Sequence, residues 1–337
     1  MGGAPRPTGY AVTALAAAMG LLKAGPIVIL IVLIGVLSFL SPVFMTPRNI
    51  GNILAQTAVI ATVAMGQHLV ILTRGIDLSV GANLALASVI GALTYKQFDS
   101  SFAVIFAMVA TGALVGATNG LVYVFGRLPH PFIITLATLS VARGLALQLS
   151  EGRALPGMPP AITFIGHESI GWLPMSAFVV AGLALVLFVV TKFLVWGNWA
   201  YALGGNPEAA RRTGIPVRGL IVSVYAISGI TAGIGAVILA GRTNAGSPLF
   251  GNLLELDTIA AVIIGGASFL GGRGHLGHAL VGAFMIGVIR NALNLLNVGI
   301  FLQLIVIGVV IVVAVEGDVL RNYLEERFRV LQAARTQ

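Results

Sequence analysis

Charged residues are scarce in this chain, and cysteine is missing altogether. Of its 337 residues only 9% are Asp, Glu, Lys or Arg, whereas a soluble domain carries about 25%. So little charge cannot cover a surface that faces water, which excludes an ordinary soluble enzyme or binding domain. The lack of cysteine excludes disulfides, thiolate metal sites and a cysteine nucleophile.

Long apolar runs fill most of the chain instead. Hydrophobic residues make up 58% of it, and the mean hydropathy is +1.00. These runs do not alternate apolar and polar residues, as the strands of a membrane barrel would. The sequence therefore predicts an all-α polytopic membrane protein. We expect about ten spanning helices, each needing about 20 apolar residues, at 26–45, 51–72, 78–95, 101–126, 131–150, 172–196, 217–240, 256–272, 277–295 and 298–316.

The positions of the basic residues predict the orientation. If the N-terminus is inside, few of the 19 lysines and arginines fall in outside regions: only Arg48, Lys96, Arg153 and Arg242. Basic residues concentrate on the cytoplasmic side of membrane proteins. We therefore expect a transmembrane domain at 26–316 between cytoplasmic tails at 1–25 and 317–337. The net charge of +8 reflects this bias and does not indicate nucleic-acid binding.

Small residues recur at helical spacing in two of the spans. Gly112, Gly116 and Gly120 are four residues apart, as are Gly229 and Gly233. In lipid, small residues on one face allow helix backbones to approach closely. This spacing predicts close packing of these two spans against neighbouring helices.

The chain also shows signs of internal duplication. The sequence ALVGA occurs at 113–117 and again at 279–283, and an aspartate opens both the third and the eighth span. Each pair is five spans apart, so the two copies would have opposite orientations in the membrane. Inverted repeats are a common transporter design. We expect spans 2–5 and 7–10 to be such a repeat.

A polar stretch at 197–216 interrupts the apolar body. Asn206 is a suitable N-cap, and Pro207 suits the first helical position. Glu208 lies at the positive end of the helix dipole, with arginines at the negative end. The pattern predicts a short, water-facing helix over 207–213, which is either a plain surface loop or a docking site for a soluble partner. Its candidate coupling residues are Asn206, Pro207, Glu208, Ala209, Ala210, Arg211, Arg212 and Gly214.

Polar residues inside or beside the spans are candidates for a substrate path. Buried polar groups in membranes are costly and face the bundle interior or a wet path. Neutral amides suit an uncharged polyhydroxylated solute, although any single one more often bridges helices. The acid before the third span could simply cap it, with Arg74 as a charge partner. The candidates are Asp77, Ser79, Asn83, Asn119, Arg143, Asp257, Asn291 and Asn294.

Catalytic and nucleotide-binding signals are weak. No lysine follows a glycine-rich phosphate-binding pattern, so we expect no ATP or other cofactor bound by this chain and no enzymatic activity. His275 and His278 lie three residues apart, but a metal site needs more ligands than these two. We interpret them as polar residues of an interfacial loop.

Several motifs together resemble the ribose-type permeases of bacterial ABC sugar importers. The similarity covers about residues 27–316 and is carried by GIDLSVG at 75–81, LATLSVARG at 136–144, GGNPEAARRTGI at 204–215, LDTIAAVIIGGASFLGGRG at 256–274 and NALNLL at 291–296. The resemblance implies a permease in the bacterial inner membrane that carries ribose or another monosaccharide. It also implies a coupling helix in the loop at 197–216.

The resemblance further implies partners. These are a second permease copy, a tandem ATPase that binds ATP and magnesium, and a periplasmic sugar-binding protein, with lipid around the bundle. Two positions depart from the family pattern, because Arg74 and Arg290 stand where neutral residues are usual. These departures concern the identity of the sugar and not the class of protein.

Other classes make different demands on the sequence. A secondary transporter driven by an ion gradient needs paired acids or a cation site deep in the spans, yet Asp77 and Asp257 lie at span ends. A membrane-embedded enzyme needs a convergent set of acid, base or metal ligands. A structural scaffold would transport nothing. The sequence favours the ATP-driven importer over these three.

Overall fold

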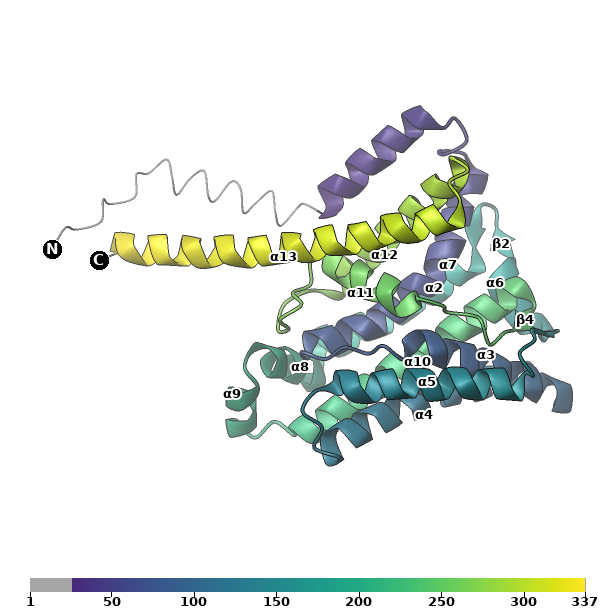
Figure 1. Ribbon diagram of the computed structural model, residues 1–337, viewed down its shortest axis with the longest axis horizontal. Helices are drawn as coiled ribbons and strands as arrows, with labels where there is room; N and C mark the ends of the chain where they lie inside the picture. Colours follow the sequence, from purple (N-terminus) through teal and green to yellow (C-terminus); the bar gives the residue numbers. More distant parts are fainter. Residues whose placement is uncertain (1–25, 337) are drawn as a thin grey trace.

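The structure, a computed structural model, describes residues 26–336 and is built almost entirely from helices (Figure 1). The predicted tail at 1–25 lies outside the described residues. In chain order the helices are Pro26–Leu40, α2 (Pro47–Leu72), α3 (Val80–Gln97), α4 (Ser101–Phe125), α5 (Pro131–Leu149), α6 (Pro160–His167), α7 (Met175–Phe193), α8 (Val195–Gly205), α9 (Pro207–Arg212), α10 (Val217–Thr243), α11 (Leu254–Ile264), α12 (Leu276–Leu295) and α13 (Ile300–Thr336).

Two very short antiparallel ladders close loops at one end of the bundle. β1 (Leu155–Pro156) pairs with β4 (Ala245–Gly246), and β2 (Ser169–Ile170) pairs with β3 (Leu173–Pro174). The first ladder joins the loop after α5 to the loop after α10. The all-α class predicted from the sequence is confirmed.

Polar residues before each apolar run set where several helices begin. The hydroxyl of Thr46 accepts from the backbone N–H of Asn49 at the start of α2, and Ser100 caps α4 in the same way. Prolines occupy the first turn of α2 and α5, where no backbone donor is needed. The apolar runs that follow then continue as uninterrupted helices.

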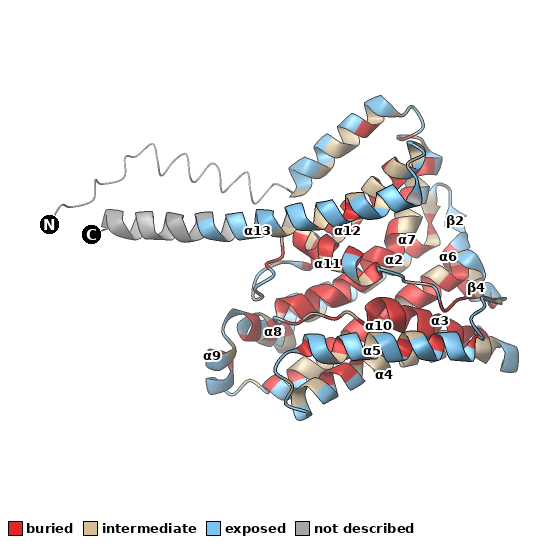
Figure 2. Ribbon diagram, viewed as in Figure 1, coloured by how far each residue is buried: buried red, intermediate tan, exposed pale blue. Residues whose placement is uncertain are grey.

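α2 and α10 pack against each other at the centre of the bundle, and most of the residues of each are buried (Figure 2). α10 packs against α3 and α4, whereas α2 packs against α11 and α12. Within each half, α3 contacts α4 and α5, and α11 correspondingly contacts α12 and α13. The packing partners therefore repeat between the halves, as the expected duplication of spans 2–5 and 7–10 requires.

The glycines of α4 and α10 bring these two helices into backbone contact. A Cβ atom added at Gly112 would lie 2.2 Å from the carbonyl oxygen of Gly229, and one at Gly116 would lie 2.1 Å from that of Tyr225. A Cβ atom added at Gly233 would lie 2.8 Å from the carbonyl oxygen of Met108 on α4. The close packing predicted from the glycine spacing is confirmed, and the two glycine rows are partners.

Within residues 26–336, six helices are long and apolar enough to cross a membrane by length and composition: α2, α4, α5, α7, α10 and α12. α4, α5 and α7 also expose large apolar side chains on their outer faces, as a lipid-facing surface would. The other predicted spans correspond to Pro26–Leu40, α3, α11 and α13. The total of ten spans therefore stays a prediction.

The observed helices depart most from the predicted ones at α6, α8, α11 and α13. α6 lies within the segment 151–171, which was expected to be a loop, and α8 precedes the predicted short helix. α11 ends at Ile264 and not at 272, because the glycine-rich segment that follows adopts positive φ angles. α13 runs without a break from the last predicted span into the predicted tail.

We expect Gly116→Ala to destabilise the folded protein. The added methyl group would meet backbone atoms of α10, which cannot move aside as a flexible side chain could. Overpacking of this kind costs about 1–3 kcal/mol or more. The midpoint of thermal unfolding of the purified protein in detergent should fall.

Gly182→Ala on α7 is the matched control, because a Cβ atom there meets nothing within 4 Å. This variant should unfold at the wild-type temperature. Equal stability of Gly116→Ala and the wild type would contradict the backbone contact between α4 and α10.

Candidate functional site

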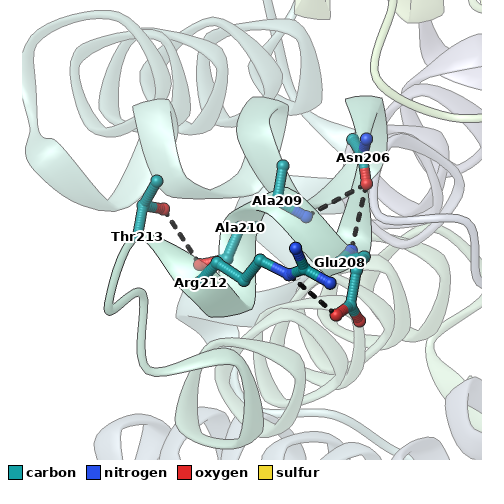
Figure 3. A network of polar contacts seen from close by, with 6 residues as sticks. All are labelled: Asn206, Glu208, Ala209, Ala210, Arg212 and Thr213. Carbon is teal, nitrogen blue, oxygen red and sulfur yellow. Dashed lines mark hydrogen bonds and ion pairs between the residues drawn. The ribbon is translucent and has the colours of Figure 1, made fainter.

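α9 is a short capped helix at one end of the molecule, next to α8 (Figure 1). The side-chain oxygen of Asn206 accepts from the backbone N–H groups of Glu208 and Ala209, each at 3.1 Å (Figure 3). Arg212 Nε donates to the Glu208 carboxylate over 3.1 Å. This ion pair is exposed and contributes little stability. The short helix predicted here is present, one residue shorter than expected.

The inner side of α9 is anchored by apolar packing. Ala210 is 3% exposed and packs in a cluster with Leu203 of α8 and Val217 and Leu220 of α10. Gly214 has a φ angle of +83°, which lets the chain turn from α9 into α10. α9 is therefore held against both of its neighbours and would move with them.

The outer side of α9 is polar and open to solvent. Glu208, Arg211 and Arg212 are all exposed. The helix thus presents a mostly basic surface on a firmly packed base, which is the form that a docking element needs. The water-facing short helix that the sequence predicted is thus present, and the coupling role of its residues stays a prediction.

The C-terminal end of α8 is bonded to the segment between α2 and α3. Arg74 Nε donates to the carbonyl oxygen of Gly204 at 2.6 Å, and its Nη2 donates to that of Gly205 at 2.8 Å. A cation at the C-terminal end of a helix also meets the negative end of the helix dipole. We call this contact region, formed by Leu72, Arg74, Gly204, Gly205, Gly272 and Gly274, the α8 junction.

The α8 junction also includes the loop between α11 and α12. The backbone N–H of Gly272 donates to the carbonyl oxygen of Leu72 at 2.8 Å. The hydroxyl of Tyr201 on α8 donates to the carbonyl oxygen of Gly274 at 2.8 Å. Burial raises the pKa of Tyr201, so the hydroxyl keeps the proton that it donates. Three segments far apart in the sequence therefore meet at the end of α8.

Sequence reasoning missed the α8 junction. Arg74 was interpreted as a charge partner of Asp77, but the structure directs its guanidinium to the carbonyl oxygens of α8. Every residue has a backbone carbonyl, so acceptors of this kind leave no signal in the sequence. The departure from the family pattern at Arg74 was the available hint, and it pointed to sugar specificity and not to α8.

Asp77 lies at the centre of a buried polar cluster, the Asp77 cluster, formed with Ser79, Asn119 and Ser228. Its Oδ1 accepts from the hydroxyl of Ser79 at 2.6 Å, and its Oδ2 accepts from the hydroxyl of Ser228 at 3.0 Å. Asn119 donates to the Ser79 hydroxyl at 2.8 Å. Asp77 also accepts from the backbone N–H of Ser79. The cluster therefore joins the start of α3 to α4 and α10.

The other candidate carboxylate has an ionic partner. Arg290 Nη2 of α12 contacts both carboxylate oxygens of Asp257 on α11, at 2.6 and 2.8 Å. The Asp257 side chain is 7% exposed, so its charge is balanced within the bundle. Arg290, the second departure from the family pattern, thus holds α11 and α12 together.

Most of the remaining candidates bridge neighbouring elements. Arg143 of α5 donates to the backbone carbonyl oxygens of Pro248 and Phe250. Asn83 of α3 donates to the backbone carbonyl oxygen of Gly112 on α4. Asn291 of α12 and Asn49 of α2 exchange two amide hydrogen bonds of 2.9 and 3.0 Å. Asn294 accepts from Gln303. The structure thus brings Asp77, Ser79 and Asn119 together, and their place in a substrate path stays a prediction.

His275 and His278 lie beside each other, with ring centroids 5.5 Å apart. Within residues 26–336 no group of three or more potential ligands gathers that could hold a metal ion.

A profile of known permeases matches nearly the whole bundle. The family described as "Branched-chain amino acid transport system / permease component" matches residues 49–315. The chain belongs to this family. Its members are components of transport systems, which agrees with a bundle that exposes large apolar side chains on its outer faces.

Curated relatives place the chain among the sugar permeases of this family. The ribose import permease RbsC of Bacillus subtilis is 39% identical, over 88% of this chain and 92% of its own length. The D-allose permease AlsC of Escherichia coli K12 is 38% identical, over 88% and 91%. The L-arabinose permease AraH of Azospirillum brasilense is 32% identical, over 89% and 88%. The resemblance predicted from the motifs is confirmed.

We expect Arg74→Gln to loosen the end of α8 without unfolding the bundle. The substitution removes two charge-assisted hydrogen bonds but keeps a side chain at a position where φ is +66°. Hydrogen exchange followed by mass spectrometry should show amides in the last turn of α8 exchanging roughly tenfold faster.

Arg211→Gln is the control, because Arg211 is exposed and lies on α9 and not in the α8 junction. It should leave exchange in the last turn of α8 unchanged. Wild-type exchange in Arg74→Gln would show that the arginine does not hold α8 in place.

Proposed function

We propose that this chain is the membrane permease of an ATP-driven importer that carries a monosaccharide across the bacterial inner membrane, with ribose as the first candidate. Membership of the permease family and relatives named for ribose, allose and arabinose support the substrate class. The single observation that carries the mechanism is that α9 is anchored. Ala210 of α9 packs against α8, and α8 is hydrogen-bonded to the rest of the bundle through Arg74.

The polar residues inside the bundle fit an uncharged sugar. Asn83 and Asn119 each have a buried amide oxygen that no donor reaches among the residues that the structure describes. A sugar offers several hydroxyl donors to such acceptors. A permease needs only weak contacts of this kind, because tight binding would hold the solute back. Asp77, Ser79, Asn83, Asn119, Arg143, Asp257, Asn291 and Asn294 are the residues that we propose for the path.

Coupling would begin at the exposed face of α9. In this proposal an ATPase subunit, expected to be a fused tandem protein that binds ATP and magnesium, contacts Glu208, Arg211 and Arg212. Movement of the ATPase displaces α9, and the apolar packing of Ala210 makes α8 follow. Through the α8 junction, Arg74 then carries the displacement to the start of α3. This chain itself supplies no catalytic residue.

The remaining parts of the importer follow from the same proposal. Two copies of the chain pair around the path, and a periplasmic sugar-binding protein delivers the substrate at the opposite face. Both termini and α9 lie on the cytoplasmic side, as the distribution of basic residues predicts.

We expect Arg211→Glu with Arg212→Glu to uncouple transport. The reversed charges would repel the acidic surface that a basic docking helix requires, while the buried base of α9 stays intact. In proteoliposomes that contain the permease, its ATPase and its binding protein, ATP-dependent uptake of radiolabelled ribose should fall by at least tenfold. Less ATPase should copurify with the variant.

Lys192→Glu, an exposed basic residue at the end of α7, is the control and should transport normally. Full uptake by the double variant in an intact complex would refute the role of α9. Wild-type uptake that persists without ATP but stops with an uncoupler would instead identify a secondary transporter.

A further inference from the structure

A basic groove opens between the end of α4 and the start of α10. Its volume is about 680 Å³, and α9 contributes one residue to its wall. Its main lining side chains are Tyr123, Arg127, Leu128, Arg211, Arg218 and Ile221. We call it the arginine groove.

The charge lining the arginine groove is of one sign. Arg127, Arg211 and Arg218 come from three different elements and converge there, and none of the lining residues is acidic. Glu208, the acidic residue of α9, is paired with Arg212 instead. An anion in the groove would therefore meet three guanidinium groups without competition from a carboxylate lining the same wall.

The start of α10 adds backbone donors to the same wall. The first intrahelical bond of α10 runs from the N–H of Leu220 to the carbonyl oxygen of Pro216. The N–H groups of Arg218 and Gly219 therefore precede the helical ladder and have no intrahelical acceptor. Donors of this kind, together with the positive end of a 27-residue helix, favour a phosphate group.

The surroundings of the arginine groove are apolar on the side of α4. Leu121, Val122 and Phe125 lie on the last turns of this helix, and their side chains are 45%, 39% and 64% exposed. The lining of the groove itself also contains the apolar side chains of Val124, Leu128 and Ile221, so apolar surface adjoins the arginines. A phosphate attached to acyl chains matches both parts, whereas an acidic protein segment would match only the basic part.

We propose that the arginine groove binds the phosphate headgroup of an anionic phospholipid. Basic pockets between the ends of membrane helices are suited to such headgroups. The acyl chains lie along the outer face of α4, and the phosphate sits between Arg127 and Arg218. The groove shares Arg211 with the exposed face of α9, but the lipid proposal does not depend on the transport function proposed above and requires only that the end of α4 lies at the membrane surface.

The test measures which lipid the purified permease retains without any ATPase present. The protein in detergent is mixed with equal amounts of phosphatidylglycerol and phosphatidylcholine, and bound lipid is counted by native mass spectrometry. The wild type should prefer phosphatidylglycerol. Arg127→Gln and Arg218→Gln should each weaken this preference roughly fivefold.

Lys192→Gln is the matched control, because it removes one exposed basic residue that does not line the groove, and it should keep the wild-type preference. Loss of bound phosphatidylglycerol on adding inorganic phosphate would assign the groove to free phosphate. That result would overturn the proposal that the groove binds a phospholipid. Equal lipid preference in the wild type and both groove variants would also overturn it, even if those variants lost ATPase binding. Because no ATPase is present, failure here leaves the proposed coupling through α9 untouched.

Discussion

Backbone contact between α4 and α10 is the constraint on which the rest of the bundle depends. In lipid, burial of apolar side chains gives helices little reason to associate, so they need close packing and polar bonds. Gly112 and Gly229 bring the two backbones together. Ser228, next to Gly229, is thereby placed within reach of Asp77, and Asn119 of α4 reaches Ser79. The small residues thus position the Asp77 cluster.

Much of this architecture was visible in the sequence because it depends on patterns of residue type. The apolar runs located the long helices, and the spacing of glycines located the tight interface. The short helix at Pro207–Arg212 was predicted from its cap, because Asn206 and Pro207 are chemically specific for a helix start. The family resemblance rested on motifs that the comparisons bear out.

What the sequence did not reveal depends on backbone atoms and on distant pairs. The partners of Arg74 are carbonyl oxygens of glycines about 130 positions away. The partner of Asp257 is Arg290, which the sequence marked only as a departure from the family pattern. α11 ended early because the following glycines adopt φ values that a helix excludes. For both arginines the deciding partner lies far away in the sequence, whereas for α11 the deciding φ angles follow directly but cannot be read from the residue types.

The long helix α13 has a geometric consequence for whatever binds at α9. Its 37 residues, at a rise of 1.5 Å each, extend about 55 Å, while the hydrocarbon core of a bilayer is about 30 Å thick. If α13 crosses the membrane, as the sequence predicts for 298–316, part of this helix must therefore stand clear of the lipid. Its C-terminal end points toward the same end of the molecule as α8 and α9 (Figure 1). An ATPase subunit bound at α9 would have the C-terminal part of α13 on one side. This helix would limit the directions from which the ATPase can approach α9.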